Sequence, residues 1–552
     1  MSPDTLSQHF DAIADAPNGV QKLRDLILQL AVRGKLVPQD PSDEPALSLL
    51  KKGAEQSDRS DWTNEREFPL PESWSWVRLD ELVDLEIGKT PSTKEPGFWA
   101  DQDAGMPWVS IGDMPAVGIV SKTGRRISMR AAEEVFKRGP APAGTLLMSF
   151  KLSIGKVALL NEPAYFNEAV VAIRPEHPEV RDYLMHCLRG IELHADTNAA
   201  IKGSTLNSSS LQRLPIPLPP LPEQRRIVEK VNQLMALCDE LEERQQRRAE
   251  ARTRMNRASL HHLTAATNDT QLAEHWRRIR DNFHRLYDAP ETVTELRQAI
   301  LQLAVRGKLV PQDPSDEPAS MLLDRIQAER ERLHKAGEIR KPKPLLQVGP
   351  DEVAFEVPEG WAWVRLGVVV DQRLGKMLDK SKNKGDLHPY LRNTNVQWLR
   401  FDLADIKEMR FQPAELEEYG LEKGDLLVCE GGEPGRCAIW PGGEGRVMFQ
   451  KALHRVRPFT GVDPWFVLYN LRADALSGLI AKYFTGATIK HMTGQALTRY
   501  VLRLPPTAEQ RRIVRKVDQL MALCDELEAK LTRSRTKAER LASAVVHHLT
   551  AA

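Results

Sequence analysis

The chain has 552 residues and a formal net charge of +1 at pH 7. This length predicts several domains, and the charge balance argues against a protein that coats nucleic acid through many phosphate contacts. No window holds the roughly 18 consecutive apolar residues that span a bilayer. The polar N-terminus does not resemble a signal peptide, so we expect a cytoplasmic protein without membrane contact.

The sequence contains an internal repeat. Residues 23–46 recur almost unchanged at 296–319, at a constant offset of 273 positions. EQRRIVEKVNQLMALCDELE at 223–242 recurs as EQRRIVRKVDQLMALCDELE at 509–528. The chain is therefore two half-molecules in tandem, in which a nearly identical frame carries two inserts that are not recognisably alike.

The repeat divides the chain into six segments. They are an N-terminal conserved helical segment and spacer (1–75), a first insert (76–216), a central long helix (217–266), the repeated helical segment with a linker (267–357), a second insert (358–504) and a distal long helix (505–552). Short apolar runs broken by Gly and Pro, such as 144–150 and 424–432, predict that each insert is a compact α+β domain.

The two long helices carry a heptad pattern, with apolar residues at alternating spacings of four and three. The seam consists of Ile227, Val231, Leu234, Cys238 and Leu241 in the central helix and of Ile513, Val517, Leu520, Cys524 and Leu527 in the distal helix. It continues through Leu541 in the distal copy and resumes at Met255 in the central copy. We expect the two helices to pair with each other in antiparallel fashion; the alternative is that each packs on its own neighbouring domain.

The sequence predicts no catalytic residue and no metal site. Residues 87–90 lack the earlier glycine of a phosphate-binding loop. No Asn/Asp-Pro-Pro-Tyr/Phe motif is present, as an amino-methyltransferase would need, and the only Glu-x-Lys lies on the distal helix at 528–530. Five scattered cysteines without a CxxC spacing argue against a disulfide framework and a zinc site.

Basic residues cluster in both inserts. Six basic side chains stand against two acidic ones at 121–139, and seven against three at 371–400. Such runs suit contacts with phosphates, which position a domain on DNA without reading its sequence. Asn393, Asn395 and Gln397 lie beside Arg392, and these residue types can pair with base edges. Both asparagines could instead cap turns.

Frame and inserts together resemble the specificity subunits of type I restriction–modification enzymes. LQLAVRGKLVPQDPSDEPA, present in both copies, resembles the repeated conserved segment of that family, and 214–231 resembles the start of its central helix. The stretches that resemble recurring recognition-domain patterns are 88–99, 107–114 and 148–158 in the first insert and 375–385, 389–396 and 426–440 in the second. Gly-Ser-Thr at 203–205 recurs in altered form at 486–488, and the first spacer, 51–70, is shorter than 324–357.

The resemblance implies an α+β fold class, with two target-recognition domains separated by two long antiparallel coiled-coil helices in a pseudo-two-fold tandem repeat. Each domain would read one half of a bipartite, asymmetric target in double-stranded DNA, and the helices would fix the gap. The frame would dock two methyltransferase (modification) subunits, and restriction/translocase subunits would join the full complex. S-adenosylmethionine, ATP and Mg²⁺ would belong to those partners, and this chain would hold no cofactor.

The basic runs and the motifs of the resemblance supply the candidate DNA-binding residues. In the first insert they are Lys89, Thr90, Ser92, Lys94, Ser110, Lys122, Arg125, Arg126, Lys151, Ser153, Lys156, Lys202, Ser204 and Thr205. In the second insert they are Lys376, Lys380, Lys382, Lys384, Arg392, Asn393, Asn395, Glu430, Arg436, Thr488 and Lys490.

Two other functions remain open on the sequence. A coiled-coil scaffold whose inserts bind protein would fit the frame, and DNA binding by the isolated inserts would distinguish it from a DNA-reading subunit. A fused methyltransferase–nuclease is the other alternative, against which the missing motifs count; methyl transfer by the purified chain alone would support it.

Overall fold

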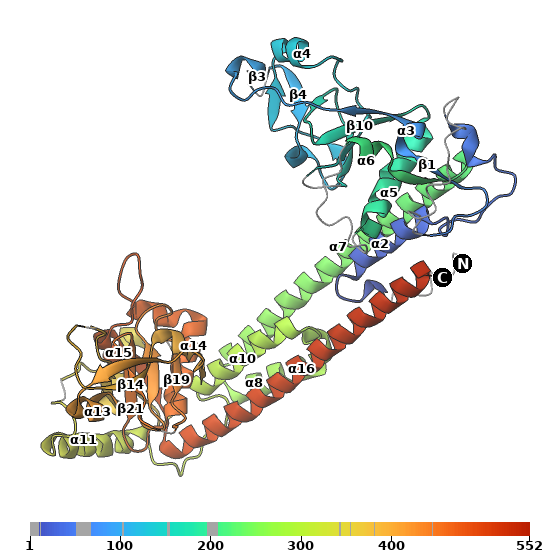
Figure 1. Ribbon diagram of the computed structural model, residues 1–552. Coiled ribbons are helices and arrows are strands. Elements are labelled where there is room, and N and C mark those ends of the chain that lie inside the picture. Colours follow the sequence, from blue (N-terminus) through green and yellow to red (C-terminus); the bar gives the residue numbers. More distant parts are fainter. Residues whose placement is uncertain are drawn as a thin grey trace. The chain divides into compact units, whose positions relative to one another are not determined.

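The computed structural model describes residues 10, 13–50, 68–101, 104–151, 155–195, 208–341, 344–353, 355–379, 381–443 and 445–551. The chain forms two compact units, one of residues 1–249 with 533–552 and one of residues 250–532. Helix α7 (Leu221–Ala265) begins in the first unit and ends in the second, and α16 (Thr507–Ala551) does the reverse (Figure 1). No helix in the described ranges is both long and apolar enough to cross a membrane.

The first unit carries two sheets and a short strand pair. The five-stranded sheet has the order β2 (Val83–Ile87), β10 (Val170–Pro175), β7 (Leu146–Ser149), β8 (Val157–Leu160) and β5 (Val117–Val120). The four-stranded sheet has the order β3 (Trp99–Ala100), β6 (Arg125–Ile127), β4 (Met106–Val109) and β9 (Tyr165–Phe166). β1 (Ser75–Arg78) pairs with β11 (Pro215–Leu218). Its shorter helices are α2 (Gly19–Val32), α3 (Leu79–Leu82), α4 (Met129–Val135), α5 (Pro178–Ala195) and α6 (Ser208–Gln212), with 3-10 turns at Ala46–Leu49, Pro96–Phe98 and Ile111–Asp113.

The second unit has a similar arrangement of sheets, but the number of strands in each sheet differs. Its four-stranded sheet has the order β13 (Val370–Leu374), β21 (Leu453–Pro458), β18 (Leu426–Cys429) and β19 (Cys437–Ile439). A three-stranded sheet joins β17 (Lys407–Phe411), β14 (Asp386–Leu391) and β20 (Met448–Phe449), and two strand pairs join β15 (Val396–Gln397) with β16 (Arg400–Phe401) and β12 (Ala362–Arg365) with β22 (Val501–Leu504). Its helices are α8 (Asp269–Asp281), α9 (Phe283–Leu286), α10 (Pro290–Val305), α11 (Ala319–Lys335), α12 (Leu366–Val369), α13 (Pro413–Tyr419), α14 (Pro464–Ser477) and α15 (Gly494–Arg499), with 3-10 turns at Pro350–Glu352, Asn393–Asn395 and Leu479–Tyr483.

A central strand of each larger sheet is almost entirely apolar. β7 reads LLMS and β18 reads LLVC, and every residue of both strands is buried. A strand whose two faces are both covered has no solvent side that needs alternating polar residues. These two strands therefore lie in the cores of the two inserts.

The identical frame segments make identical contacts in the two units. The indole nitrogen of Trp74 donates to Glu223 at 3.0 Å, and that of Trp361 donates to Glu509 at 2.9 Å. An arginine one turn further along each long helix, Arg226 or Arg512, forms an ion pair with an aspartate of the conserved segment at 2.7 or 2.6 Å. These contacts explain why the Pro-Gln-Asp-Pro-Ser-Asp-Glu sequence is repeated so closely.

The C-terminal end of each long helix is held by the conserved segment of the opposite half. Arg33 and Lys35 donate to the carbonyl of Thr550 at 2.6 and 3.4 Å. Arg306 and Lys308 donate to the carbonyl of Thr264, both at 3.3 Å. The last carbonyls of a helix lack intrahelical partners and carry partial negative charge, so a cation stabilises them. The Arg-Gly-Lys sequence of both repeats thus serves as a helix cap.

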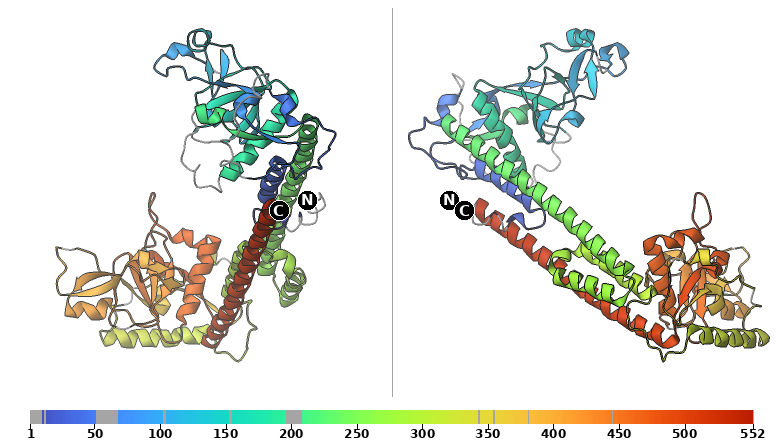
Figure 2. Two further views of the ribbon diagram at one scale, coloured as in Figure 1. Left: turned by 45° about the vertical axis from the view of Figure 1, so that its right-hand side comes forward. Right: turned by 180° about the vertical axis from the view of Figure 1, so that it is seen from behind.

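The seam residues of the two long helices lie in different buried clusters. Those at the start of α7 pack with α2 and α5, and those at the start of α16 pack with α10 and α14. Figure 2 shows α2 alongside α7, where Arg24 forms an ion pair with Asp239 at 2.6 Å. Each cluster also contains the far end of the other long helix, as an antiparallel course requires. The two long helices thus run antiparallel, as predicted, and the start of each seam also packs on the conserved helix of its own half.

The predicted seam is wrong at two equivalent places. Leu541 is 60% exposed and its neighbour Ala542 is buried, while Met255 is 45% exposed and its neighbour Asn256 is buried. Five turns of an ideal helix take about 18 residues, whereas five half-heptads take about 17.5, so a strict seven-residue pattern gradually drifts off the buried face. Counted from Cys238 and Cys524, the buried position therefore moves one residue onward in both copies.

Candidate nucleic-acid interface

The loops that follow four strands of the second insert meet at one edge. β13 and β18 are both antiparallel to β21 and so run the same way, and β14 is parallel to β20. Gln450 N donates to Leu391 O at 3.1 Å, Lys376 N to Phe449 O at 3.1 Å, and Glu430 N to Ala452 O at 2.9 Å. The resulting surface, called here the strand-end surface of the second insert, consists of residues 375–379, 392–395, 430–435 and 450–452.

A hairpin at 485–491 extends this surface. Thr485 and His491 exchange two backbone hydrogen bonds of 2.9 Å, and Met492 N donates to Glu430 O at 2.7 Å. The tip carries Thr488, Ile489 and Lys490, all exposed. Two of the predicted DNA-binding residues, Thr488 and Lys490, are thereby joined to Glu430, which lies more than 50 residues earlier in the chain.

The first insert builds an equivalent surface from its own strand ends. Lys89 N donates to Phe166 O at 2.9 Å, Asn167 N to Val109 O at 3.0 Å, and Phe150 N to Ala169 O at 3.0 Å. Gly124 N donates to a carboxylate oxygen of Asp113 at 2.8 Å, which brings the basic run near residue 122 to the same edge. The strand-end surface of the first insert therefore consists of residues 88–90, 110–114, 122–125, 150–151 and 167–169.

Most of the candidates in the first insert lie on or near this surface. The exposed ones are Lys89, Thr90, Ser92, Lys94, Lys122 and Arg125. The guanidinium of Arg125 stacks over Trp99 at 5.0 Å, and the ammonium of Lys151 lies 5.2 Å from the Phe150 ring. Arg126 instead donates to the Gly105 carbonyl at 3.0 Å. Five candidates lie outside the described residues: Ser153, Lys202, Ser204, Thr205 and, in the second insert, Lys380.

Several candidates hold the turn after β4 or β14 in shape. In the first insert Ser110 donates its hydroxyl to Asp113 at 2.6 Å, and Lys156 donates to the carbonyls of Ile111 and Met114 at 2.9 and 3.0 Å. In the second insert the roles of Asp113 and Lys156 have counterparts, whereas Arg392 takes the place of Ser110 and pairs its side chain with Asp405 instead. The sequence could not separate such residues from base readers, because both roles use the same side chains at the same loop.

In the second insert Asn395 takes the place of Asp113. Its carbonyl oxygen accepts from Arg392 N at 2.9 Å, and its amide donates to the carbonyls of Asp402 and Asp405 at 2.9 and 3.2 Å. Arg436 takes the place of Lys156 and donates to Asn393 O at 2.9 Å. Asn395 is therefore a turn cap, the second of the two roles considered for it, and its side chain is buried.

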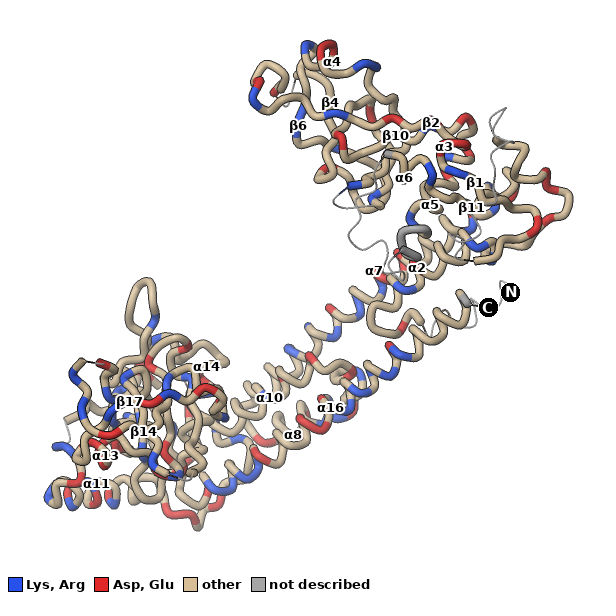
Figure 3. The backbone as a smooth tube through the Cα atoms, viewed as in Figure 1, with Lys and Arg blue, Asp and Glu red and all other residues tan. Residues whose placement is uncertain are grey.

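Lys376 is also withdrawn from the surface. Its ammonium forms an ion pair with Glu415 at 2.6 Å and donates to Arg410 O at 3.0 Å, and the residue is buried. Arg392 pairs with Asp405 at 2.8 Å. Among the described residues of this basic run, the exposed cations are Lys382, Lys384 and Arg400. Figure 3 shows acidic residues interspersed among the basic ones in this insert.

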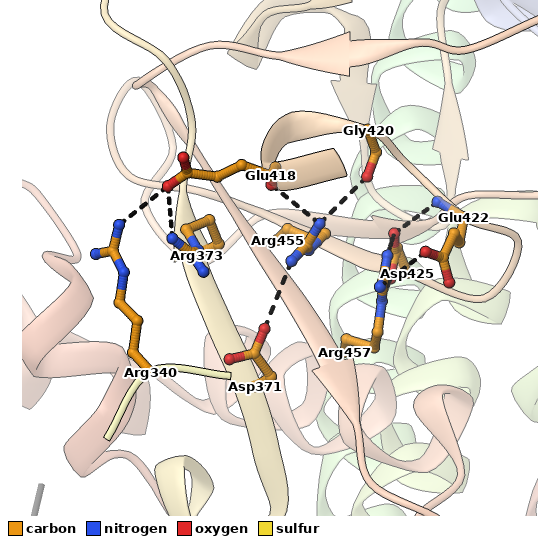
Figure 4. A network of polar contacts seen from close by, with 9 residues as sticks. All are labelled: Arg340, Asp371, Arg373, Glu418, Gly420, Glu422, Asp425, Arg455 and Arg457. Carbon is orange, nitrogen blue, oxygen red and sulfur yellow. Dashed lines mark hydrogen bonds and ion pairs between the residues drawn. The ribbon is translucent and has the colours of Figure 1, made fainter. Parts of the chain in front are cut away.

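The buried Arg455 and the half-buried Arg457 on β21 belong to a polar network that no sequence motif indicated (Figure 4). Arg455 donates to the carbonyls of Glu418 and Gly420, both at 3.2 Å, and Arg457 makes a bidentate contact with the buried Asp425 at 2.7 and 2.8 Å. A signal exists in the sequence HRVRP, where charged residues occur within an otherwise buried strand. Their spacing alone does not reveal their partners.

Burial also sets the protonation of groups beneath the surface. Burial lowers the pKa of His454 to about 4; its Nε2 lies 3.2 Å from Met492 O, and its Nδ1 lies 3.3 Å from the side-chain amide nitrogen of Gln372. Because the Met492 carbonyl can only accept, the neutral ring carries its proton on Nε2. Burial raises the pKa of Glu430, against the opposing effect of His491 and Lys451. Lys451, an exposed cation at this edge, was not among the predicted residues.

The two strand-end surfaces offer hydrogen-bond donors and exposed cations but no assembled catalytic centre. Within the described ranges, no group of three or more His, Cys, Asp or Glu side chains is arranged to hold a metal ion. All five cysteines are buried and unpaired. The arrangement suits contact with a polyanion more than chemistry on it.

Comparison with known proteins identifies relatives over the whole chain. A family model described as the type I restriction modification DNA specificity domain matches residues 71–251 and 358–534. The EcoEI specificity subunit of Escherichia coli is 29% identical over 96% of this chain and 93% of its own, and the EcoAI specificity subunit of the same species is 30% identical over 92% and 90%. A chain from a solved structure concerned with complex assembly and conformational transition of the type I R-M system aligns over 88% of this chain and 99% of its own, at 20% identity and a TM-score of 0.49.

Proposed function

Because the chain belongs to the family of type I restriction–modification DNA specificity subunits, we propose that each insert reads one half of a bipartite, asymmetric target in double-stranded DNA. The Escherichia coli relatives are named as specificity subunits of type I restriction enzymes, which supports a recognition role for this chain. In this assignment the chain selects the site, and catalysis with its S-adenosylmethionine, ATP and Mg²⁺ lies in partner subunits.

The observation that carries the proposal is the pairing of one frame with two different reading surfaces. Trp74 and Trp361 anchor the two inserts to their long helices through the same contact. At the strand ends, however, the first insert presents Lys89, Thr90 and Arg125, and the second presents Asn393, Lys384 and the 485–491 hairpin. A common frame with unlike surfaces is what two half-sites of different sequence require.

The frame has two further roles in this proposal. The long helices α7 and α16 set the distance between the half-sites, and the two equivalent sets of frame contacts each dock one methyltransferase (modification) subunit. Restriction subunits join the same complex. We place this role in the cytoplasm, where a DNA-binding subunit of such a complex would meet its target.

Domain exchange tests the reading assignment. Replacing residues 358–504 with the matching insert of a relative should change one half of the methylated target and leave the other half intact, as measured by mapping methylated bases in DNA exposed to the assembled complex. The same exchange of residues 76–216 should change only the other half. A change in both halves after a single exchange would contradict independent reading, and a complex without DNA preference would contradict the proposal itself.

A length change tests the spacing role. Lengthening α7 and α16 by the same number of residues, at the boundary between the two units, should alter the preferred gap while both half-sites keep their sequence. The matched control substitutes residues of α7 and α16 next to the insertion points without changing the length of either helix. An unaltered gap would show that the helices do not set the spacing.

A further inference from the structure

A cavity of about 190 Å³ opens at the strand-end surface of the first insert. Its lining comes from the end of β2 (Glu86 and Lys89), from residues 136–139 after α4, and from Tyr165 and Phe166 of β9. The rings of Phe136 and Tyr165 lie 4.3 Å apart and form an apolar wall. Lys89, Lys137 and Arg138 lie exposed at the mouth, so the cavity combines an apolar wall with a positively charged entrance.

In the second insert the same place is filled by the chain itself. Strand registers align the two inserts: Ala172 lies opposite Glu86 on β10 and β2, and Arg455 lies opposite Arg373 on β21 and β13. Side chains of opposed residues lie on the same face of a sheet. The guanidinium of Arg455 reaches the carbonyls at the end of α13, as Figure 4 shows. Ala172 has no side chain long enough to do so.

The lysines that follow β2 and β13 also differ between the two inserts in whether an internal carboxylate neutralises them. Lys89 and Lys376 occupy equivalent positions, because their amides donate to the carbonyls of Phe166 and Phe449. The ammonium of Lys376 is neutralised by Glu415 at 2.6 Å. The position of Glu415, third in the seven-residue helix α13, is taken in the seven-residue helix α4 by Ala131.

Lys89 is therefore left without an internal counterion. In the described part of the chain its ammonium makes one hydrogen bond, to the Val135 carbonyl at 3.3 Å, and no ion pair. Lys137 and Arg138 lie beside it at the mouth of the cavity, and both are exposed. The single carboxylate of the lining, Glu86, is already paired with Arg174 at 2.7 Å, and Arg138 approaches it only to 3.9 Å.

We propose that this cavity is a phosphate-binding site, which takes one phosphodiester group of the DNA backbone between Lys89, Lys137 and Arg138. Cationic donors form short, strong hydrogen bonds with phosphate oxygens, and the apolar wall of Phe136 and Tyr165 excludes water and strengthens them. The inference rests on the proposed reading of DNA by the first insert. It makes the two inserts unequal: the first takes its counterion here from DNA, and the second carries its own in Glu415.

The test measures DNA binding by the full chain assembled with its modification subunits. Lys89→Ala should weaken binding to specific and nonspecific duplexes alike and should reduce the slope of log affinity against log salt by about one. Arg138→Ala should do the same, and Lys89→Arg should restore both values. The control is Lys423→Ala, which removes an exposed lysine at the amino end of β18, the opposite edge from the strand-end surface.

Neutral backbone substitution locates the contact. Duplexes that carry a methylphosphonate at one position at a time should reveal one position at which the unaltered complex binds more weakly and the Lys89→Ala complex does not. The site is not a DNA phosphate site if methylphosphonate substitution weakens binding of the Lys89→Ala complex and of the unaltered complex equally at every position of the duplex. The same holds if Lys89→Ala leaves the salt slope unchanged. If the variant loses only binding of inorganic phosphate, followed by ³¹P resonance, the cavity serves a free anion and the DNA assignment is overturned. A complex that binds no DNA before substitution contradicts the proposed function instead, so the two failures are distinguishable.

Discussion

The two inserts have the same strand directions and equivalent edge loops, yet they fill the space beneath those loops in opposite ways. The second insert packs it with ion pairs, among them Lys376 with Glu415 and Arg373 with Glu418. The first insert leaves a cavity beside Lys89. The comparison teaches that a recognition domain can keep its backbone while exchanging an internal counterion for one that a ligand supplies.

The frame, unlike the inserts, keeps the same contacts in both units. Its contacts recur with the same partners and nearly the same lengths in the two units, as the Trp74–Glu223 and Trp361–Glu509 hydrogen bonds show. Identical sequence is retained where a fixed geometry is needed, and divergence is confined to the inserts.

The largest expected effect comes from removing an arginine of the internal network. Arg457→Ala leaves Asp425, which is 1% exposed, as a buried carboxylate without its cation. Breaking such a pair costs about 3 to 5 kcal/mol, so the second unit should unfold at a clearly lower urea concentration. The matched change Arg174→Ala, at the equivalent strand position of the first insert, breaks a more exposed pair with Glu86 and should cost about 1 kcal/mol or less. Equal losses would show that the two inserts do not differ in this way.

Acid should destabilise the second unit through His454. Burial lowers the pKa of His454 to about 4, below the value of about 6.5 expected in the unfolded chain. The unfolded state then binds a proton first, so stability present above pH 6.5 is lost as the pH falls towards 4, by about 3 kcal/mol at most. His454→Gln should flatten this part of a denaturation profile measured against pH. His186 of the first insert, whose pKa burial also lowers to about 4, predicts a parallel loss in the first unit.

The frame contacts should respond alike in the two halves. Glu223→Ala removes the acceptor of the buried Trp74 N–H and of the Gln39 amide. Glu509→Ala removes the acceptor of the buried Trp361 N–H and of the Gln312 amide. Each unsatisfied buried donor costs about 1 to 3 kcal/mol, and the two variants should lose the same amount of unfolding free energy. A difference larger than about 1 kcal/mol between them would mean that the repeat is not energetically symmetric.

The smallest effect is expected at the exposed loop after β13. Lys384→Ala should weaken binding to all duplexes equally and reduce the salt slope by about one, because a phosphate contact carries no sequence information. Lys382→Ala should behave similarly, since Lys382 is 84% exposed and its ion pair with Asp379 is 3.6 Å long. Asn393→Ala, by contrast, should alter preference at one base position of one half-site. Binding titrations over a salt series, with specific and nonspecific duplexes, distinguish the two outcomes. A loss confined to one base position in a lysine variant would contradict its phosphate role.

Part of the interface followed from the sequence. Lys89, Thr488 and Lys490 were predicted, and the structure places them, exposed, at the strand ends or on the adjoining hairpin. Lys156, Arg436 and Asn395 were predicted for the same reason, but they stabilise the turns beneath that edge. Lys451 was missed, because only the parallel pairing of β14 with β20 brings its loop to the surface.

The sequence by itself determined the tandem repeat, the long helices and the division into frame and inserts, because repeated segments and periodic apolar residues are local properties of the chain. It could not determine which face of a long helix is buried 18 residues from Cys238, where the small difference between the heptad period and the helical period has accumulated to about half a residue. Nor could it determine that Lys376 is buried and Lys89 exposed, although both follow a glycine at the end of a strand. That difference depends on Glu415, about 40 positions further along the chain, which only the tertiary structure brings beside Lys376; the equivalent helix position of the first insert holds the uncharged Ala131.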